Sequence, residues 1–443
     1  MLYTPNRIPS HHHGSGDAPF ALRNGKLISR GRLWSDVRAL ARQLPDDRAY
    51  VINLCEDRYL FCLTLLAAMA RRQICLLPPC GLEGIIKDIL RDYPNAYVAS
   101  ERTPPSLCCD WFEVAKPDTL ETSGPVHFDD AQIALVAFTS GSTGYPQACP
   151  HTFGTFRRSA KMALSSLGMA QSNRLVVSTT PPQHMYGLET SVFWPLFSGL
   201  AMYAGRPFFP EDIHRVVKSA PLPCLLASTP THLRSLSDTS SHWGNLEHIL
   251  SSTAQLSVGL ARKTEAAFVC RLQEIYGSTE TLSFASRFTA CETLWRPYLG
   301  AVLAQDSQGQ SLLTSPHLNH ALVLQDSLRL ESDGGFEILG RSSDMVKIGG
   351  KRASLAELNR RLTDIEGVAD GLFFAREDGD GECRMVAVVV GNLDKPSIRQ
   401  QLKLYLDEVF LPRAIYFVEA IPRNKVGKIV KKEWEALMKG IGY

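Results

Sequence analysis

The chain has 443 residues, of which 44% are hydrophobic and 21% are charged, and its formal net charge is +2. This balance excludes the strongly basic surface that drives nucleic-acid or membrane binding, so neither is expected as a partner. The length predicts about two or three domains, because a single hydrophobic core rarely grows this large.

Membrane and secretory features are not expected either. The longest apolar run, Leu60 to Ala70, is shorter than the roughly 20 residues that a membrane span needs, so it predicts a core helix. Residues 1–7 lack the apolar segment of a secretory signal, which favours a cytoplasmic location. The eleven cysteines form no Cys-x-x-Cys pair, and this pattern predicts reduced thiols instead of a disulfide framework or a zinc site.

Helices and strands alternate from residue 31 to residue 99. Apolar positions at helical spacing predict the first helix over 31–44. The elements expected after it are a strand at 49–54, an apolar helix at 60–70, a strand at 74–77, a helix at 82–91 and a strand at 96–99. This order is typical of crossover units on a mostly parallel sheet. Residues 101–130, rich in Pro, Thr, Asp and Ser, are expected to form an irregular connection.

The alternation resumes after a strand expected at Ile133 to Val136. The elements predicted next are helices near 155–167, 187–200 and 213–218, and strands at 174–178, 201–203 and 224–228. Past Gly300, short strands separated by glycine turns predict an antiparallel, barrel-like subdomain. The expected fold is therefore α/β: a large N-terminal domain of stacked β-sheets with helices and a barrel-like subdomain over 1–341, and a small mobile α+β domain over 342–443.

A hydroxyl-rich glycine loop follows the strand that begins at Ile133. Its glycines let the backbone curl close to a ligand, and its hydroxyls add donors suited to phosphate oxygens. The loop consists of Thr139, Ser140, Gly141, Ser142, Thr143 and Gly144. It predicts a polyphosphate grip, with a plain surface turn as the alternative. It is not the P-loop of NTPases, which ends in Gly-Lys-Ser/Thr, because Tyr145, Pro146 and Gln147 stand there instead.

A second segment, Tyr276 to Glu280, places an aromatic face, a glycine, two hydroxyls and a carboxylate within five residues. Such a group can stack on a base, bind an acyl or phosphate oxygen and anchor a hydrated magnesium ion. By itself it is also compatible with an ordinary Gly-Ser turn.

The two segments together resemble the motifs of the adenylate-forming enzymes, the superfamily of acyl-CoA and aryl-CoA ligases, peptide-synthetase adenylation domains and luciferases. Further matches in the same order are Pro181 to Gly187, Ser251 to Ala254, Gly340 to Lys347 and Pro422 to Ile429. The resemblance implies an enzyme that uses ATP and Mg²⁺ to activate a carboxylic acid as an acyl-adenylate and transfers the acyl group to the thiol of CoA or of an acyl carrier protein.

The resemblance also implies roles for individual residues. Thr279 would contact the α-phosphate, Glu280 would hold Mg²⁺, and Lys428 would be the catalytic lysine. His184, otherwise a helix cap, would border the acyl carboxylate as a further catalytic residue. The implied ATP- and AMP-binding residues are Thr139, Ser140, Gly141, Ser142, Thr143, Gly144, Gln147, Ser252, Thr253, Tyr276, Gly277, Ser278, Asp326 and Arg341. The implied acid pocket contains His184, Tyr186, Ser252, Gly277 and Leu282, the hinge is Ser343, and the thiol tunnel passes Gly349 and Gly350.

Three positions depart from the family pattern. Gln147 replaces the usual lysine, Leu324-Gln325 replaces Thr-Gly before Asp326, and Ser343 replaces Asp or Lys at the hinge. Because a neutral amide cannot match the charge of lysine beside pyrophosphate, Gln147 predicts weakened ATP binding, with Lys161 or an arginine compensating.

The acid is inferred from the segments that would border the pocket. Residues 184–186, 193–194 and 282–284 are rich in aromatic side chains, which suits a planar aryl acid. The compact chain is similar to the ligases that load hydroxybenzoate onto acyl carrier proteins for aryl-polyene or xanthomonadin-type pigments. A medium-chain fatty acid is the alternative substrate, and an adenylate-binding module without turnover is the alternative of another class.

Overall fold

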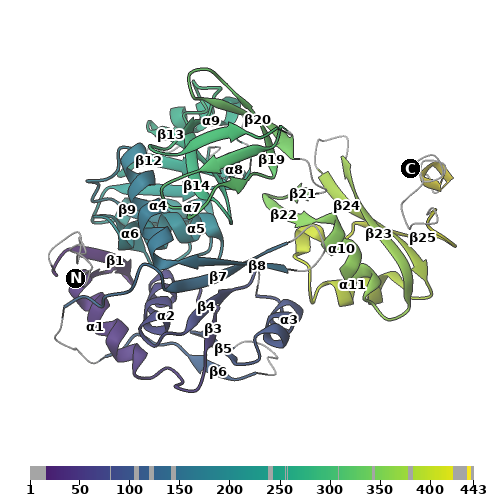
Figure 1. Ribbon diagram of the computed structural model, residues 1–443, viewed down its shortest axis with the longest axis horizontal. Coiled ribbons are helices and arrows are strands. Elements are labelled where there is room, and N and C mark those ends of the chain that lie inside the picture. The colour runs from purple at the N-terminus through teal and green to yellow at the C-terminus, as the bar shows by residue number, and fades with distance from the viewer. Residues whose placement is uncertain are drawn as a thin grey trace, which may run out of the picture.

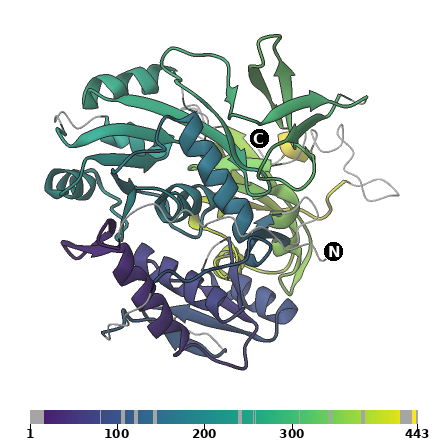
Figure 2. The same cartoon turned by 60° about the vertical axis from the view of Figure 1, so that its left-hand side comes forward.

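The computed structural model describes residues 16–79, 81–103, 109–118, 124–140, 146–237, 243–254, 256, 258–307, 309–341, 345–377, 383–422 and 437–440. Its N-terminal part contains two large β-sheets with helices between them and on their outer faces (Figures 1 and 2). Within the described residues, no helix is both long enough and apolar enough to cross a membrane.

The first sheet has six strands, and all neighbours are parallel except the last pair. Its order is β6 (Trp111–Glu113), β5 (Ala96–Ser100), β3 (Tyr50–Asn53), β4 (Ile74–Leu77), β7 (Ile133–Ser140) and β8 (Pro146–Thr152). Successive residues such as Val51 and Ile52 point into different cores on the two faces. The short β6 lies in the stretch that was expected to be irregular, and it is a strand because it pairs with the edge of β5.

The second sheet has nine strands, with parallel pairing in the centre and antiparallel pairing at both edges. Its order is β15 (Arg296–Pro297), β14 (Leu282–Arg287), β13 (Arg271–Ser278), β12 (Leu246–Ser251), β11 (Cys224–Ser228), β9 (Leu175–Ser178), β10 (Ala201–Tyr203), β1 (Pro19–Arg23) and β2 (Lys26–Ser29). The turn between β13 and β14 carries Thr279 and Glu280, two of the predicted site residues.

The helices form three layers around these sheets. Between the sheets lie α1 (Arg30–Ala41), α2 (Arg58–Ala70), α4 (Phe153–Ser166), α5 (Met185–Leu188), the π-helix η1 (Glu189–Phe193) and α6 (Trp194–Leu196). The outer layers are α3 (Glu83–Asp92) on the six-stranded sheet, and α7 (Pro210–Ser219), α8 (Pro230–Leu236) and α9 (Val258–Phe268) on the other. The apolar run of 60–70 is confirmed as a core helix, because nearly every residue of α2 is buried.

Arg58, at the start of α2, is a fully buried cation that ties the helical layer to the nine-stranded sheet. Its guanidinium donates to the Ser178 carbonyl at 2.8 Å and to Ser191 Oγ at 2.8 Å. It also donates to the carbonyls of Thr180 and Gly205. These bonds fix the loop that leaves the carboxyl end of β9, where the candidate site begins.

Two small antiparallel sheets follow the nine-stranded sheet. They are β16 (Val302–Gln305), β17 (Ser311–Thr314) and β18 (Leu322–Val323), and the pair β19 (Asp326–Leu330) and β20 (Phe336–Arg341). Leu313, Leu328 and Phe336 from the two sheets share one core with Trp295. This region carries Asp326 at the start of β19.

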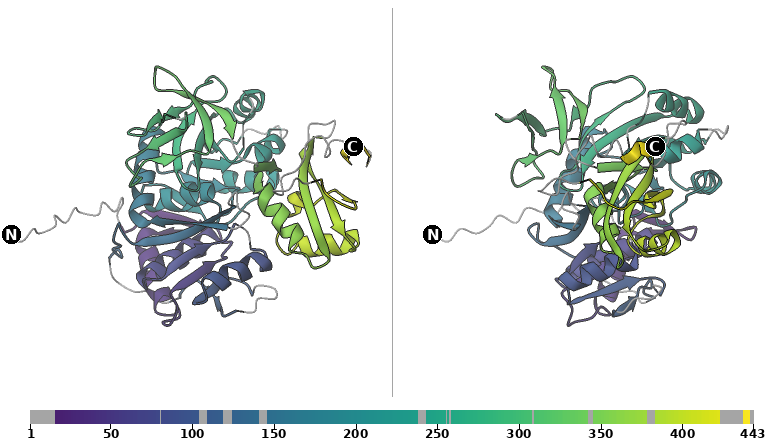
Figure 3. Two further views of the ribbon diagram at one scale, coloured as in Figure 1. Left: turned by 45° about the vertical axis from the view of Figure 1, so that its right-hand side comes forward. Right: turned by 90° about the vertical axis from the view of Figure 1, so that its right-hand side faces the viewer.

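The residues from 345 onward form a small α+β unit, coloured yellow-green in Figures 1 and 3. Its elements are β21 (Met345–Ile348), β22 (Lys351–Ser354), α10 (Leu355–Thr363), β23 (Val368–Glu377), β24 (Cys383–Gly391), α11 (Lys395–Leu402), the 3-10 helix η2 (Glu408–Phe410) and β25 (Ala414–Phe417). It packs against α3: Arg361 pairs with Asp88 at 2.6 Å, and the Gly84 amide donates to the Leu404 carbonyl at 3.2 Å.

Candidate active site

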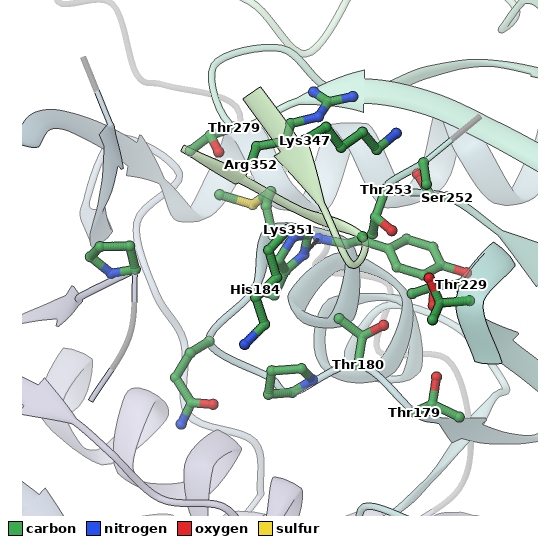
Figure 4. Close-up of a pocket in the computed structure, with 18 of the residues that line it drawn as sticks. Thr179, Thr180, His184, Thr229, Ser252, Thr253, Thr279, Lys347, Lys351 and Arg352 are labelled. Atoms are coloured by element: carbon green, nitrogen blue, oxygen red, sulfur yellow. Dashed lines mark hydrogen bonds between the residues drawn. The ribbon is translucent and has the colours of Figure 1, made fainter. Parts of the chain in front are cut away.

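A deep cleft opens at the carboxyl ends of the parallel strands β9, β11 and β12, which is where open α/β sheets bind ligands. The residues that follow these strands line it with hydroxyl groups, as Figure 4 shows. They are Thr179, Thr180, Thr229, Ser252 and Thr253. Ser252 and Thr253 were predicted for this site, whereas the three threonines after β9 and β11 were not.

Thr253 has an unusual backbone. Its φ is +76°, a region that β-branched residues rarely adopt. Within the described residues, its covered Oγ1 has no hydrogen-bond partner. Such strain persists where a function requires it, so the conformation agrees with a binding role for this loop.

The predicted base-binding and ribose-binding residues lie together. Tyr276 donates from its hydroxyl to Asp326 Oδ2 at 2.6 Å, although the two residues are far apart in the sequence. The Tyr276 ring packs near Phe284, Trp295 and Phe336, with ring centroids 5.2–5.9 Å apart. Both residues line the cleft, so the position of Asp326, which the sequence supported only by spacing, agrees with the implied nucleoside site.

Gly277 sits where no side chain fits. A Cβ atom there would lie 2.0 Å from the Leu282 carbonyl oxygen. Leu282 was expected to border the acid pocket, but its side chain is fully buried in the core and is absent from the cleft wall. Successive strand residues face opposite sides, so Ser283 lines the cleft instead. Thr279, Glu280 and Ser278 line it as predicted.

His184 is both a helix cap and a cleft residue. Its Nδ1 accepts from the Tyr186 amide at 3.2 Å at the start of α5. The ring is open to the water of the cleft but lies deep among protein atoms. The pKa of His184 is lowered to about 4, chiefly by this burial and further by Arg352 and Lys351. The imidazole is therefore neutral at pH 7, as suits a group beside an acyl carboxylate.

A hairpin of the small unit, β21–β22, enters the same cleft from the other side (Figure 4). Its turn residues Gly349 and Gly350 have φ of +57° and +78°. A Cβ atom on Gly350 would lie 3.3 Å from Thr231 Oγ1 of the large part. Lys351, which pairs with Asp407, and Arg352 bring positive charge next to His184. The predicted thiol-tunnel glycines thus lie at the cleft.

Two residues that flank the phosphate loop are placed by the β7–β8 ladder. Thr139 and Gln147 are paired across it, and both line the cleft. Lys161, suggested as a substitute for the missing lysine, is exposed on α4 and is not a cleft residue. Cations that do line the cleft are Arg102, Arg206, Arg287, Lys347, Lys351 and Arg352.

Several predicted residues lie outside the described residues: Gly141, Ser142, Thr143, Gly144, Ser343 and Lys428. Ser140 and Arg341 are the terminal residues of β7 and β20, and only their backbone is described.

Only part of the expected aromatic wall lies at the described cleft. Phe193 and Trp194 are fully buried in the core and do not line it, because the π-helix and α6 turn them toward helices and sheet. Tyr186 does line it, and its hydroxyl donates to the Leu250 carbonyl at 3.0 Å. The aromatic side chains that line the described cleft come largely from other segments, among them Phe208, Phe209 and Trp295.

Glu189 is the cleft residue that sequence reasoning missed most clearly. It is 4% exposed, and its carboxylate accepts from the Ser283 amide at 3.0 Å and from Ser283 Oγ at 2.8 Å. Burial raises the pKa of Glu189 to about 7, although these hydrogen bonds oppose the shift. A lone carboxylate within the apolar stretch 187–200 was the signal that could have identified it.

The metal-binding side chains at the cleft fit a magnesium ion that is bound mainly by the phosphates of the substrate. The described residues contain no cluster of three metal-ligating side chains. Magnesium is commonly bound by one or two carboxylates together with substrate phosphates, and Glu280 supplies such a carboxylate at the cleft.

Comparisons with known proteins agree with this geometry. The sequence profile of the family described as AMP-binding enzyme matches residues 37–311. The chain is 28% identical over 309 residues to a 4-coumarate–CoA ligase of Halorhodospira halophila, covering 67% of this chain and 74% of that protein. It is 25% identical over 394 residues to a 3-hydroxybenzoate–CoA ligase of Aromatoleum sp. (strain CIB), covering 79% of this chain and 74% of that protein.

A solved structure shares the fold over nearly the whole chain. It is an o-succinylbenzoate CoA synthetase from Bacillus subtilis, bound to a product analogue, with a TM-score of 0.79 at 17% identity. The match covers 95% of this chain and 96% of that one. The expected α/β fold is thereby confirmed.

Proposed function

The chain belongs to the AMP-binding enzyme family, and from this premise we propose that it activates a hydroxybenzoate-type aryl acid and transfers it to a pantetheine thiol. Whatever the acid, the general activity is that of an AMP-forming acid–thiol ligase that uses ATP. One observation supports the proposal most: the Thr279–Glu280 turn, the Tyr276–Asp326 pair and the glycine hairpin meet in one cleft.

In the proposed first step, a carboxylate oxygen of the acid attacks the α-phosphorus of ATP and pyrophosphate leaves. Both reactants are anionic, so the site must offset negative charge before they can meet. Thr279 would donate to an α-phosphate oxygen, and Lys428 would approach from residues 342–443, which we propose to be a separate domain from 1–341. Glu280 would hold Mg²⁺, which offsets phosphate charge when bound.

In the second step, the thiol sulfur attacks the acyl carbon, AMP leaves and the thiol proton is lost to solvent. The β21–β22 hairpin supports this step, because Gly349 and Gly350 line the cleft and their lack of side chains permits close approach of a narrow pantetheine arm. The neutral His184 adds no positive charge beside the acyl group. Either CoA or an acyl carrier protein can supply such an arm, and we propose the carrier protein, in a cytoplasmic pigment pathway, on the resemblance described above.

The lining of the cleft supports a substituted aryl acid over a medium-chain fatty acid. Within the described residues, the covered hydroxyls of Thr180 and Thr253 have no hydrogen-bond partner. A fatty tail would leave them unpaired, which is costly, whereas a polar substituent could bind them. The 3-hydroxybenzoate relative is named for an acid with such a substituent.

Pyrophosphate release across a panel of acids tests the proposal. We expect release with hydroxybenzoates, and then AMP and a thioester when CoA or a phosphopantetheinylated carrier protein is added. Pyrophosphate release only with medium-chain fatty acids would show that the substrate is a fatty acid and not an aryl acid. If no acid supports release, the chain would be an adenylate-binding module without turnover.

A further inference from the structure

The Thr279–Glu280 turn is stabilised first by its own side chains. The Ser278 amide donates to Thr281 Oγ1 at 2.9 Å, and the Thr281 amide donates to Ser278 Oγ at 3.2 Å. Leu282, which ends the turn, has φ of +54°, which is uncommon for a residue with a side chain. Such a turn needs outside contacts to fix its direction in the cleft.

The first outside contact comes from His317, between β17 and β18. This histidine is fully buried, and its Nε2–H donates to the Thr281 carbonyl at 2.7 Å. Its Nδ1 accepts from Ser315 Oγ at 2.8 Å. Because a carbonyl can only accept, these partners fix one neutral tautomer, and burial lowers the pKa of His317 in agreement.

The second contact comes from the opposite side, from Glu189 in η1. Its carboxylate accepts hydrogen bonds from the amide and hydroxyl of Ser283, the residue that follows the turn. Hydrogen bonds to a charged acceptor are stronger than neutral ones. The histidine therefore fixes a carbonyl of the turn, and the carboxylate fixes the amide of Ser283, the second residue of β14, on its far side.

A third contact joins the turn to the strand that follows the phosphate loop. His151 in β8 is 5% exposed and is hydrogen-bonded to the backbone of Thr279. Its Nε2 lies 3.3 Å from Cys149 Sγ in the same strand. Burial lowers the pKa of His151 to about 4, so this ring is neutral too.

We propose that His317 and Glu189 are positioning residues of the adenylation step, which hold the Thr279–Glu280 turn where the Thr279 hydroxyl meets the α-phosphate and the Glu280 carboxylate can hold Mg²⁺. This inference rests on the proposed roles of Thr279 and Glu280, but not on which acid is used. Neither residue touches the reacting atoms. Their contribution is geometric, and displacing a reacting group by about 1 Å can slow a reaction about a hundredfold.

The variants are chosen to separate positioning from folding. His317→Phe keeps the ring shape and removes the donor, whereas His317→Gln restores an N–H near the position of Nε2. Glu189→Gln keeps an acceptor oxygen without the charge. His214→Phe is the matched control, because His214 stacks on Trp243 with ring centroids 5.2 Å apart, in a different core.

Two readouts are needed. ATP–pyrophosphate exchange gives kcat and KM, and calorimetry gives the affinity for AMP without any acid. For His317→Phe we expect kcat to fall about ten- to hundredfold and AMP to bind about tenfold more weakly. The KM for the acid and the unfolding midpoint should change little. His317→Gln should recover most of the loss, Glu189→Gln should resemble His317→Phe, and the control should match wild type.

Several outcomes would overturn the inference. The inference is wrong if His317→Phe and Glu189→Gln keep the wild-type kcat and AMP affinity. It is also wrong if His317→Gln loses as much activity and AMP affinity as His317→Phe. If His317→Phe does not fold, the comparison of Glu189→Gln with wild type decides. If the wild-type protein binds AMP but shows no ATP–pyrophosphate exchange with any acid, only the proposed function is refuted. The AMP affinities of the variants would still test the positioning roles.

Discussion

Two segments reach the cleft in different ways, the turn between β13 and β14 and the hairpin β21–β22. The turn belongs to a nine-stranded sheet and is held by buried groups from η1, from β8 and from the connection between β17 and β18. The hairpin is a two-stranded sheet whose Lys351 and Arg352 are exposed and whose turn approaches Thr231 through a glycine. We infer that the turn is the fixed half of the site, and that the hairpin can leave so that Lys428 takes its place.

The largest expected effect tests this division directly. Lys428→Ala should slow adenylate formation about a hundred- to a thousandfold, the range for losing one group that stabilises transition-state charge. Thioester formation from a supplied acyl-adenylate should stay within about threefold of wild type. Single-turnover assays of each half-reaction measure both rates. Lys425→Ala is the control, and equal loss of both half-reactions in Lys428→Ala would contradict the proposed role.

A second prediction concerns the fixed half and its buried carboxylate. Glu189 interacts electrostatically with Tyr298. Burial raises the pKa of Glu189 from 4.5 to about 7. A folded pKa above the unfolded value means that the native state binds the proton more tightly, so stability falls as pH rises from about 4.5 to 7. At 1.36 kcal/mol per pH unit, the loss is about 3 kcal/mol.

Urea unfolding between pH 5 and pH 8 measures this loss. Glu189→Gln cannot titrate and should flatten that part of the pH dependence. Glu247→Gln is the control, because Glu247 is a partly exposed partner of Arg174. An unchanged pH dependence in Glu189→Gln would show that Glu189 is ionised in the folded protein throughout this range.

The third prediction concerns the hairpin. Gly350→Ala should slow thioester formation about tenfold and leave adenylate formation unchanged, because Gly350 has φ of +78° and its Cβ would lie 3.3 Å from Thr231. The control is Gly334→Ala in the β19–β20 turn, which has φ of +81° and nothing within 4 Å. Loss of both half-reactions in Gly350→Ala would instead place the hairpin in the cleft during both steps.

The sequence predicted the two halves unequally well. Order and spacing of glycine motifs located the Tyr276 to Glu280 turn and the Gly349–Gly350 turn, because their backbone needs glycine at fixed places. The contacts that hold the turn could not be predicted, because they show no local pattern. Glu189 lies 94 residues from its partner Ser283, and His317 lies 36 residues from its partner Thr281. Leu282 and Phe193 were misplaced for the same reason, as aromatic or apolar type does not reveal which face of a strand or helix meets the cleft.

The smallest expected effect lies at Gln147, where β8 leaves the phosphate loop. Gln147 is exposed at the cleft opposite Thr139, so Gln147→Lys adds a charge in solvent-screened surroundings, where an ion pair is worth up to about 1 kcal/mol. The KM for ATP should therefore fall by at most about fivefold, and the gain should shrink as ionic strength rises. Gln147→Met is the neutral control. A KM for ATP that does not change in Gln147→Lys would mean that the lysine position of the family plays no part in ATP binding here, and that the cations lining the cleft already supply the charge.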